Sequence, residues 1–234
     1  MKKFSTLTLA LIALLGISQV KAQTVDEIVD KYVNALGGKE KLSSLNTIKL
    51  SGTMNSMGNE ISITITRKHM VGSRADFSVM GTENYQIITP SKGSSFMPVR
   101  GMTEPAATTE QELKIGQSQL DVQSPLFNYK EKGNIVEYIG MEKSDNDDCY
   151  KLKLTFKNGI ITNYFISAKD NRIVKTSGKR TVNGEEMEVE TKLSNYKQNG
   201  DGYWFAYTVS SNIQGETNFD KIESNVPVDE GIFK

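Results

Sequence analysis

Alternation with a period of two residues is the feature of this 234-residue chain that most constrains its fold. The clearest stretch is residues 61–66, where isoleucine alternates with Ser or Thr, and similar stretches cover residues 48–54, 74–79, 150–156 and 186–193. Successive side chains of a β-strand point to opposite faces, so each stretch has one apolar and one polar face. The pattern predicts a mainly β fold, an antiparallel sheet with few helices and one face toward water.

Short turn signals separate these stretches. They include Lys157-Asn158-Gly159, Val182-Asn183-Gly184 and the run Asn199-Gly200-Asp201-Gly202. Asn-Gly and related pairs favour the tight turns of β-hairpins. We therefore expect about ten or eleven strands joined mostly by hairpins.

Two segments carry helix signals. Thr24 and Glu27 have the spacing of a capping box, apolar residues then recur at helical spacing as far as Leu36, and Gly37-Gly38 provides the stop. A shorter helical piece is expected at residues 39–45. Residues 98–124 break the strand pattern, and Thr109 with Glu112 predicts a capped helix inserted between two groups of strands.

The first 22 residues have the order of a cleavable signal peptide. Lys2 and Lys3 precede an apolar stretch at residues 7–17, and small or polar residues lead to Ala22. The apolar stretch is too short to span a bilayer, so no permanent membrane insertion is expected. Cys149 is the only cysteine, which leaves none for a lipid anchor at the cleavage point and none for an internal disulfide. We expect a periplasmic protein without a lipid anchor, with one domain over residues 23–234.

Composition argues against several classes of function. The chain has 28 basic and 28 acidic residues, without the basic excess that nucleic-acid binding needs. One histidine, His69, and one cysteine cannot supply a typical zinc site, and no cofactor motif is present. We interpret His69 as a solvated turn residue and the acidic run at 145–148 as a polar hairpin tip. No catalytic residue is assigned, although a pair of carboxylates remains a possible alternative.

The order of short sequence stretches resembles a known superfamily. "ALGGKEKL" ends the first helix, "TIKLSGTM" follows as a strand, and "YFISAKDNRIVKT", "SNYKQNGDGYWFAYTV" and "NVPVDEGIFK" come later. This order is similar to the outer-membrane lipoprotein carrier (LolA/LolB-like) superfamily, in its Bacteroidetes-type branch of exported lipoprotein-sorting proteins. The resemblance implies a strongly curved, incomplete barrel, with the N-terminal helix and the mid-chain helix capping its concave side.

The resemblance also implies an apolar cavity that takes up acyl chains. In this sequence Arg67, which has the parity of Ile61, Ile63 and Ile65, is the candidate for an arginine that points toward the cargo, whereas Arg74 has the polar parity of its strand. Residues 94–102 combine Met, Pro and Gly and suit a movable flap. The residues expected to line the cavity are Leu50, Met54, Ile61, Ile63, Ile65, Arg67, Phe77, Val79, Phe96, Met97, Leu152, Leu154, Phe156, Met187 and Val189.

Our leading hypothesis is a non-catalytic periplasmic carrier or sensor for a lipid or lipoprotein acyl chain, active in lipoprotein sorting. The alternative is an interaction module with a filled core that serves other envelope proteins. The alternating pattern fits both, because a cavity wall and a packed core need the same apolar residues. The cargo, the partner proteins and the oligomeric state are left open.

Overall fold

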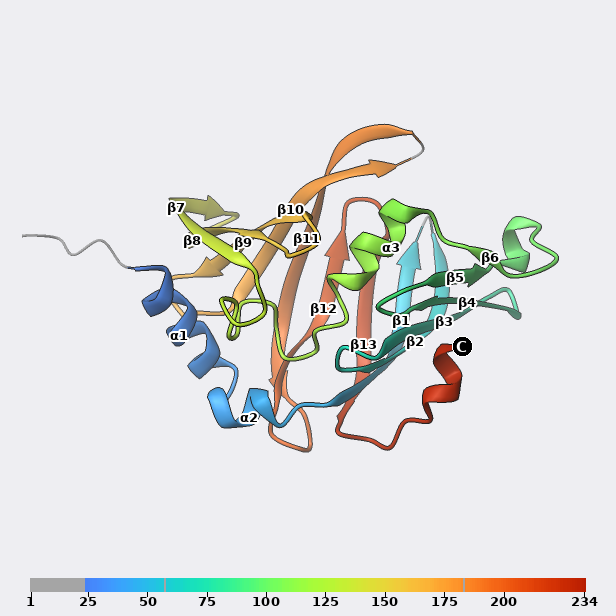
Figure 1. Ribbon diagram of the computed structural model, residues 1–234, viewed down its shortest axis with the longest axis horizontal. Helices are drawn as coiled ribbons and strands as arrows, with labels where there is room; N and C mark the ends of the chain where they lie inside the picture. Colours follow the sequence, from blue (N-terminus) through green and yellow to red (C-terminus); the bar gives the residue numbers. More distant parts are fainter. Residues whose placement is uncertain (1–23, 57, 183) are drawn as a thin grey trace, which may run out of the picture.

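The computed structural model describes residues 24–56, 58–182 and 184–234. The predicted signal peptide therefore lies outside the described residues. A single antiparallel sheet of 13 strands dominates the described chain, and its order is β6-β5-β4-β3-β2-β1-β13-β12-β11-β10-β9-β8-β7 (Figure 1). The two end strands, β6 and β7, are not paired with each other, so the sheet is not closed into a barrel.

The strands follow one another as two meanders. The first contains β1 (Thr47–Ser56), β2 (Asn59–Lys68), β3 (Gly72–Val79), β4 (Thr82–Ile88), β5 (Gly93–Phe96) and β6 (Ala106–Ala107). The second contains β7 (Ile135–Ser144), β8 (Asp147–Thr155), β9 (Ile161–Ser167), β10 (Ile173–Val182), β11 (Glu185–Gln198), β12 (Trp204–Ser211) and β13 (Gly215–Ser224). The first and last strands, β1 and β13, pair with each other and join the meanders into one sheet.

The strand count exceeds the ten or eleven expected from sequence. The short strands β5 and β6 cover four and two residues, and they pair within the segment between Gly93 and Ala107. Neither has an alternating pattern, and backbone pairing of β5 with β4 and of β6 with β5, rather than a buried face, holds them in place. The mainly β fold class and the hairpin connections are confirmed.

Helix α1 (Val25–Ala35) covers the β7–β9 end of the sheet. It begins with the predicted capping box, in which Thr24 Oγ1 accepts from the Glu27 backbone N–H at 3.2 Å and a Glu27 carboxylate oxygen accepts from the Thr24 N–H at 3.0 Å. Its buried side chains pack with Leu152, Leu154 and Ile166 into the larger hydrophobic core. Helix α2 (Lys39–Ser43) is two residues shorter than predicted.

Helix α3 (Glu110–Gln117) is the predicted mid-chain helix, and Thr109 and Glu112 form its capping box. Gly116 packs directly on Ile88 of β4, where a Cβ would come within 2.7 Å of that side chain. At the other end of the sheet, Asn158 Nδ2 donates to Lys114 O at 2.8 Å and Gln111 Nε2 donates to Thr181 Oγ1 at 3.1 Å. Helix α3 therefore bridges two distant parts of one curved sheet, and Figure 1 shows it in front of the middle strands.

The C-terminal segment crosses the opposite face. Its 3₁₀ helix η2 (Glu230–Phe233) places the Phe233 ring against Gly72, where any Cβ would clash with the ring. Lys68 pairs with Glu230 at 2.6 Å, and Arg74 donates to Ile232 O. This contact covers the outward side of β2 and β3, so the helices α1 and α3 define the inward side.

Candidate functional site

The register of the strands places most of the predicted lining residues on one face. Ile61 lies opposite Met54 on β1, and Met54 lies opposite Thr217 on β13. Thr217 in turn lies opposite Val209, and Val209 opposite Leu193 on β11. Directly opposed residues of an antiparallel pair point to the same side of the sheet. This inward face includes Ile88, which contacts α3, so it is the face that the helices cover.

Much of this inward face is apolar and remains partly exposed. The predicted residues of β1–β3 lie in it, together with four apolar residues of β12 and β13 that were not singled out from sequence. We call this set the open face, and it comprises Met54, Ile61, Ile63, Ile65, Phe77, Val79, Phe205, Tyr207, Val209 and Phe219. Four of them, Ile65, Phe205, Tyr207 and Phe219, form its inner margin and pack against the second hydrophobic cluster. Helix α3 lies over the same face and buries none of its own side chains. The covering helix and the sheet are therefore not packed as tightly as a core.

Three of the predicted lining residues belong to packed cores instead. Leu152 and Leu154 are 0 % exposed under α1, and Leu50 is buried in a second cluster with Leu45 and Ile222. Phe156 lies just past the end of β8 and packs against the α1 core. These residues have the predicted strand parity, but neighbouring side chains already fill the space in front of them.

The structure corrects one further position. Phe96 lies opposite Tyr85 on β4, and its ring contacts the Tyr85 ring at 5.8 Å between centroids. Tyr85 faces Asp76, which has the outward parity of β3, so Phe96 points away from the open face. Met97 was expected in the flap at residues 94–102, and it directly precedes the 3₁₀ helix η1 (Pro98–Arg100) of that segment. Met187 and Val189 do have the inward parity of β11, although Met187 is 40 % exposed.

Arg67 reaches the inner end of β2 as its parity predicts. Its Nε donates to Ser73 Oγ at 3.3 Å and its Nη2 donates to Gln119 Oε1 at 3.2 Å, next to the end of α3. No carboxylate of the described residues pairs with it. Burial without a counter-ion lowers the pKa of Arg67 to about 10, because a charged group loses hydration that no partner replaces.

A second inward arginine was missed by the sequence reasoning. Arg180 lies opposite Met187, and its guanidinium donates to Thr162 Oγ1 at 3.2 Å and to the carbonyls of Ile161 and Lys179. Gly178 makes room for it, since a Cβ there would lie 2.9 Å from Nη1. The signal that could have revealed it is the alternation Gly178, Arg180 along β10, which only the register with β9 and β11 makes interpretable.

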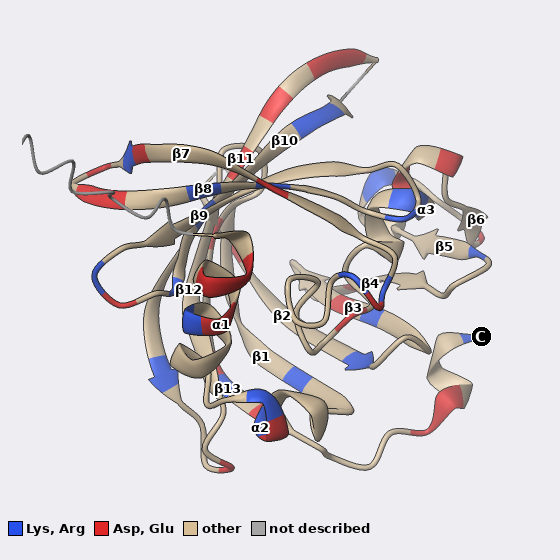
Figure 2. Cartoon of the chain, turned by 60° about the vertical axis from the view of Figure 1, so that its left-hand side comes forward, with Lys and Arg blue, Asp and Glu red and all other residues tan. Residues whose placement is uncertain are grey.

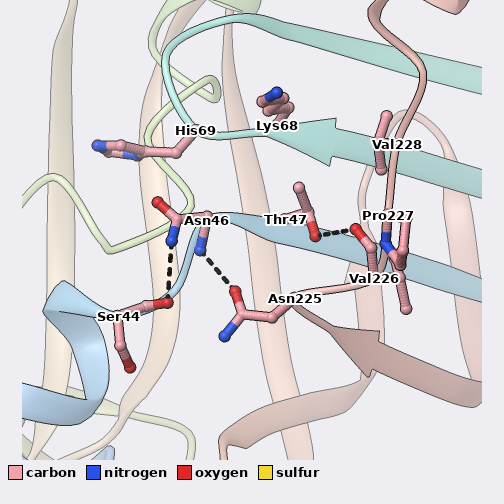
Figure 3. Close-up of a pocket in the computed structure, with 9 residues that line it drawn as sticks. All are labelled: Ser44, Asn46, Thr47, Lys68, His69, Asn225, Val226, Pro227 and Val228. Carbon is pink, nitrogen blue, oxygen red and sulfur yellow. Dashed lines mark hydrogen bonds between the residues drawn. The ribbon is translucent and has the colours of Figure 1, made fainter.

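Two shallow pockets that are open to solvent lie elsewhere. One, of about 580 Å³, is lined by Ser44, Asn46, Thr47, Lys68, His69, Asn225, Val226, Pro227 and Val228 (Figure 3). Its polar groups are largely bonded to each other: Asn46 N donates to Asn225 Oδ1 at 2.8 Å, and Thr47 Oγ1 donates to Val226 O at 2.7 Å. The other, of about 320 Å³, lies between α1 and the segment 127–131. Neither contains a predicted lining residue.

His69 is not the solvated turn residue that the sequence suggested. Its side chain is 23 % exposed and lies 3.4 Å from Asp121, which also pairs with Lys132 at 2.7 Å. Desolvation is the main cause that lowers the pKa of His69, and Asp121 opposes it. The contacts among His69, Asp121 and Lys132 connect the segment after α3 to the turn between β2 and β3. In the same turn, Met70 N donates to Leu120 O. The acidic run at 145–148 does form a hairpin tip, and Asp145 pairs there with Lys192.

Charged residues gather on the helices and on the β10–β11 hairpin (Figure 2). Within the described residues, no three His, Cys, Asp or Glu side chains come together as a metal site requires. The described helices also include none that is long and apolar enough to cross a bilayer.

The fold of this chain is similar to that of several known proteins. No protein-family model matches the chain, and no curated protein sequence does either. Among solved structures, a LolA superfamily protein from Nitrosomonas europaea aligns with a TM-score of 0.58 and 12 % identity, over 91 % of this chain and 98 % of that one. The fold is LolA-like.

Two more structures share the LolA-like fold at low identity. A domain assigned to outer membrane lipoprotein sorting in Vibrio parahaemolyticus has a TM-score of 0.52 and 16 % identity, over 90 % of this chain and 97 % of that domain. A DUF1329 family protein from Desulfovibrio piger has a TM-score of 0.52 and 11 % identity, over 91 % and 98 % of the two chains. At these identities the likeness concerns the fold alone.

Proposed function

We propose that this chain is a non-catalytic periplasmic carrier or sensor that holds an acyl chain of a lipid or lipoprotein against the open face. The observation that carries the proposal is the contrast in burial between two apolar regions on the same face of the sheet. Leu152 and Leu154 are fully buried beneath α1, while Ile61, Ile63 and Phe77 remain partly exposed although they face inward. Large apolar patches left accessible on one side of a protein are typical of ligand or partner sites.

An acyl chain has the right chemistry for this surface. Its burial releases about 0.8 kcal/mol per methylene, so a chain of a dozen methylenes is driven onto the open face even after the costs of ordering. Helix α3 lies over the same surface and leaves its own Leu113 and Ile115 partly exposed, which provides apolar contacts on the second side of a bound chain. The LolA-like fold supports the same function.

Mass spectrometry of protein purified from the bacterial periplasm tests the proposal. We expect co-purified lipid, and uptake of a fluorescent fatty acid after delipidation. Ile63→Asp should abolish uptake while the protein stays folded, because a charge on a partly exposed surface keeps some hydration. Ile135→Asp is the matched control, since Ile135 is 62 % exposed on β7 and has the outward parity. Absence of lipid together with absence of uptake would refute the carrier function.

Export is a separate part of the proposal. The first 22 residues support cleavage after Ala22 and release of residues 23–234 as one periplasmic domain without a lipid anchor. N-terminal sequencing of the exported protein tests this, and a mature chain that begins elsewhere or remains in the membrane fraction contradicts it.

A specific observation supports the alternative of an envelope interaction module. The edge strand β7 exposes Ile135, Ile139 and Met141 by 62, 53 and 53 %. An unpaired edge with apolar side chains can accept a strand from another protein. The Ile63→Asp variant distinguishes the two functions. If the protein is an interaction module with a filled core, this variant should unfold, and the wild-type protein should already show no lipid binding.

A further inference from the structure

Positive charge predominates among the charged side chains of the inward face. At the described inward positions of β1, β2, β3, β10 and β12 there is no Asp or Glu, and the charged residues among them are Arg67 and Arg180. On the neighbouring strand β11, Glu185 also has the inward parity, but it is exposed and forms no ion pair with either arginine within the described residues. Desolvation lowers the pKa of both guanidinium groups, which is the cost of holding unpaired cations there.

Arg180 is the better placed of the two for a ligand. Its Nη1 and Nη2 donate to three oxygen acceptors, Thr162 Oγ1 and the backbone carbonyls of Ile161 and Lys179. Its Nε has no acceptor within the described chain, so part of the guanidinium fork remains available. The acidic residue that interacts with it through space, Glu188, lies opposite Lys179 and so points outward.

Tyr164 completes a polar cluster beside Arg180. It lies on the same face of β9 as Thr162 and at the margin of the larger core, where it is 8 % exposed, and its hydroxyl has no hydrogen-bond partner among the described residues. Burial is the main cause that raises the pKa of Tyr164, so the phenol keeps its proton and can donate it. A free phenol donor next to a guanidinium without a carboxylate is suited to an oxyanion.

The carboxylates of α3 and of the segment after it already bond to other partners. On α3, Glu112 closes the capping box and Glu110 pairs with Lys114 at 2.7 Å. Asp121, at the base of the inward side, pairs with Lys132. None of these residues pairs with Arg180, so the positive charge at this site is not neutralised from the covering segments.

We propose that Arg180, with Thr162 and Tyr164, binds the oxyanion head of an acyl ligand, a carboxylate or phosphate, whose hydrocarbon chain lies on the open face. This inference rests on the proposed function and narrows its cargo to acyl chains with an anionic head. Because a charge-assisted hydrogen bond to a guanidinium is stronger than a neutral one, we expect a preference of at least about tenfold for an acid over its neutral ester.

Paired probes test the inference on the full delipidated protein. Binding of anthroyloxy-stearic acid and of its methyl ester is measured by fluorescence for wild type, Arg180→Gln, Arg180→Lys and Lys179→Gln. We expect wild type to bind the acid at least tenfold more tightly, Arg180→Gln to bind both within twofold, and Arg180→Lys to keep an intermediate preference. Lys179→Gln is the matched control, because it removes the same charge from the outward face, where Lys179 pairs with Glu186.

The outcomes are distinguishable. Equal binding of acid and ester by wild type, or loss of the preference in Arg67→Gln but not in Arg180→Gln, overturns the head-group site and leaves the carrier function standing. Absence of binding by both probes overturns the carrier function and this inference with it. Lysophosphatidate should displace the acid at micromolar concentration, and displacement by inorganic phosphate at the same concentration would instead assign the site to a free anion.

Discussion

The two ends of the inward face differ in how they are covered. At β7–β9, helix α1 lies flat on the strands and inserts four buried side chains, so Leu152, Leu154 and Ile166 are inaccessible to water. Toward the other end, helix α3 packs Gly116 against Ile88 of β4 and buries no side chain of its own. Both ends have the same strand pattern. The difference teaches that a covering helix creates a core only where its apolar stripe matches the strands beneath it.

The largest effect is expected at the packed end. Leu152→Ala should lower the free energy of unfolding by about 3 kcal/mol, because truncation leaves an enclosed cavity that neighbours cannot fill. Urea denaturation of the variant measures this. A loss below about 1 kcal/mol would mean that the β7–β9 end is also loosely packed.

Replacing the N-cap threonine by alanine should affect stability differently in α1 and in α3. Thr24→Ala should lower global stability by about 1 kcal/mol, since α1 is part of the core. Thr109→Ala should leave the global value nearly unchanged and accelerate amide exchange within α3, because that helix opens locally. Hydrogen exchange with mass spectrometry distinguishes the two, and equal global losses would contradict the comparison.

A truncation on the open face should cost less than one in the core. Ile63→Ala is expected to lower the free energy of unfolding by about 1 kcal/mol or less, because the partly exposed side chain leaves no enclosed cavity. Fatty-acid uptake should weaken at the same time. A stability loss comparable to that of Leu152→Ala would show that the face is packed after all.

The smallest effect concerns the surface ion pair at α1. Lys130, bonded at 2.7 Å, is the main cause that lowers the pKa of Asp26, and the Tyr129 hydroxyl contributes at 2.8 Å. A lowered folded pKa stabilises the protein above the unfolded value of about 3.9, and this contribution is lost as the pH falls through the folded value. Asp26→Asn should therefore cost about 0.5 kcal/mol or less at pH 7 and nothing near pH 2. Thermal unfolding at both pH values measures it, and an equal cost at both would exclude the ion pair as the cause.

Much of the fold could be predicted from local sequence. The capping boxes at Thr24 and Thr109 form as expected, and the alternation at Ile61, Ile63 and Ile65 gives a strand with the predicted parity. Phe96 was expected in a flap over the cavity because its strand has only four residues and no alternation that reveals it, whereas pairing with β4 turns its ring toward Tyr85. Arg180 was overlooked because its strand mixes Gly, Lys, Thr and Arg, and its direction depends on pairing with β9 and β11.

The sequence by itself determined which residues become strands, where the helices begin, and which side of most strands is apolar, because these follow from local periodicity and capping. Only the tertiary structure decided which apolar positions are packed and which stay accessible. That distinction depends on contacts between residues far apart in the chain, such as Tyr32 with Ser124 under α1 and Lys114 with Asn158 at α3. Alternation records that a side chain avoids water, but it contains no information on whether another side chain fills the space in front of it.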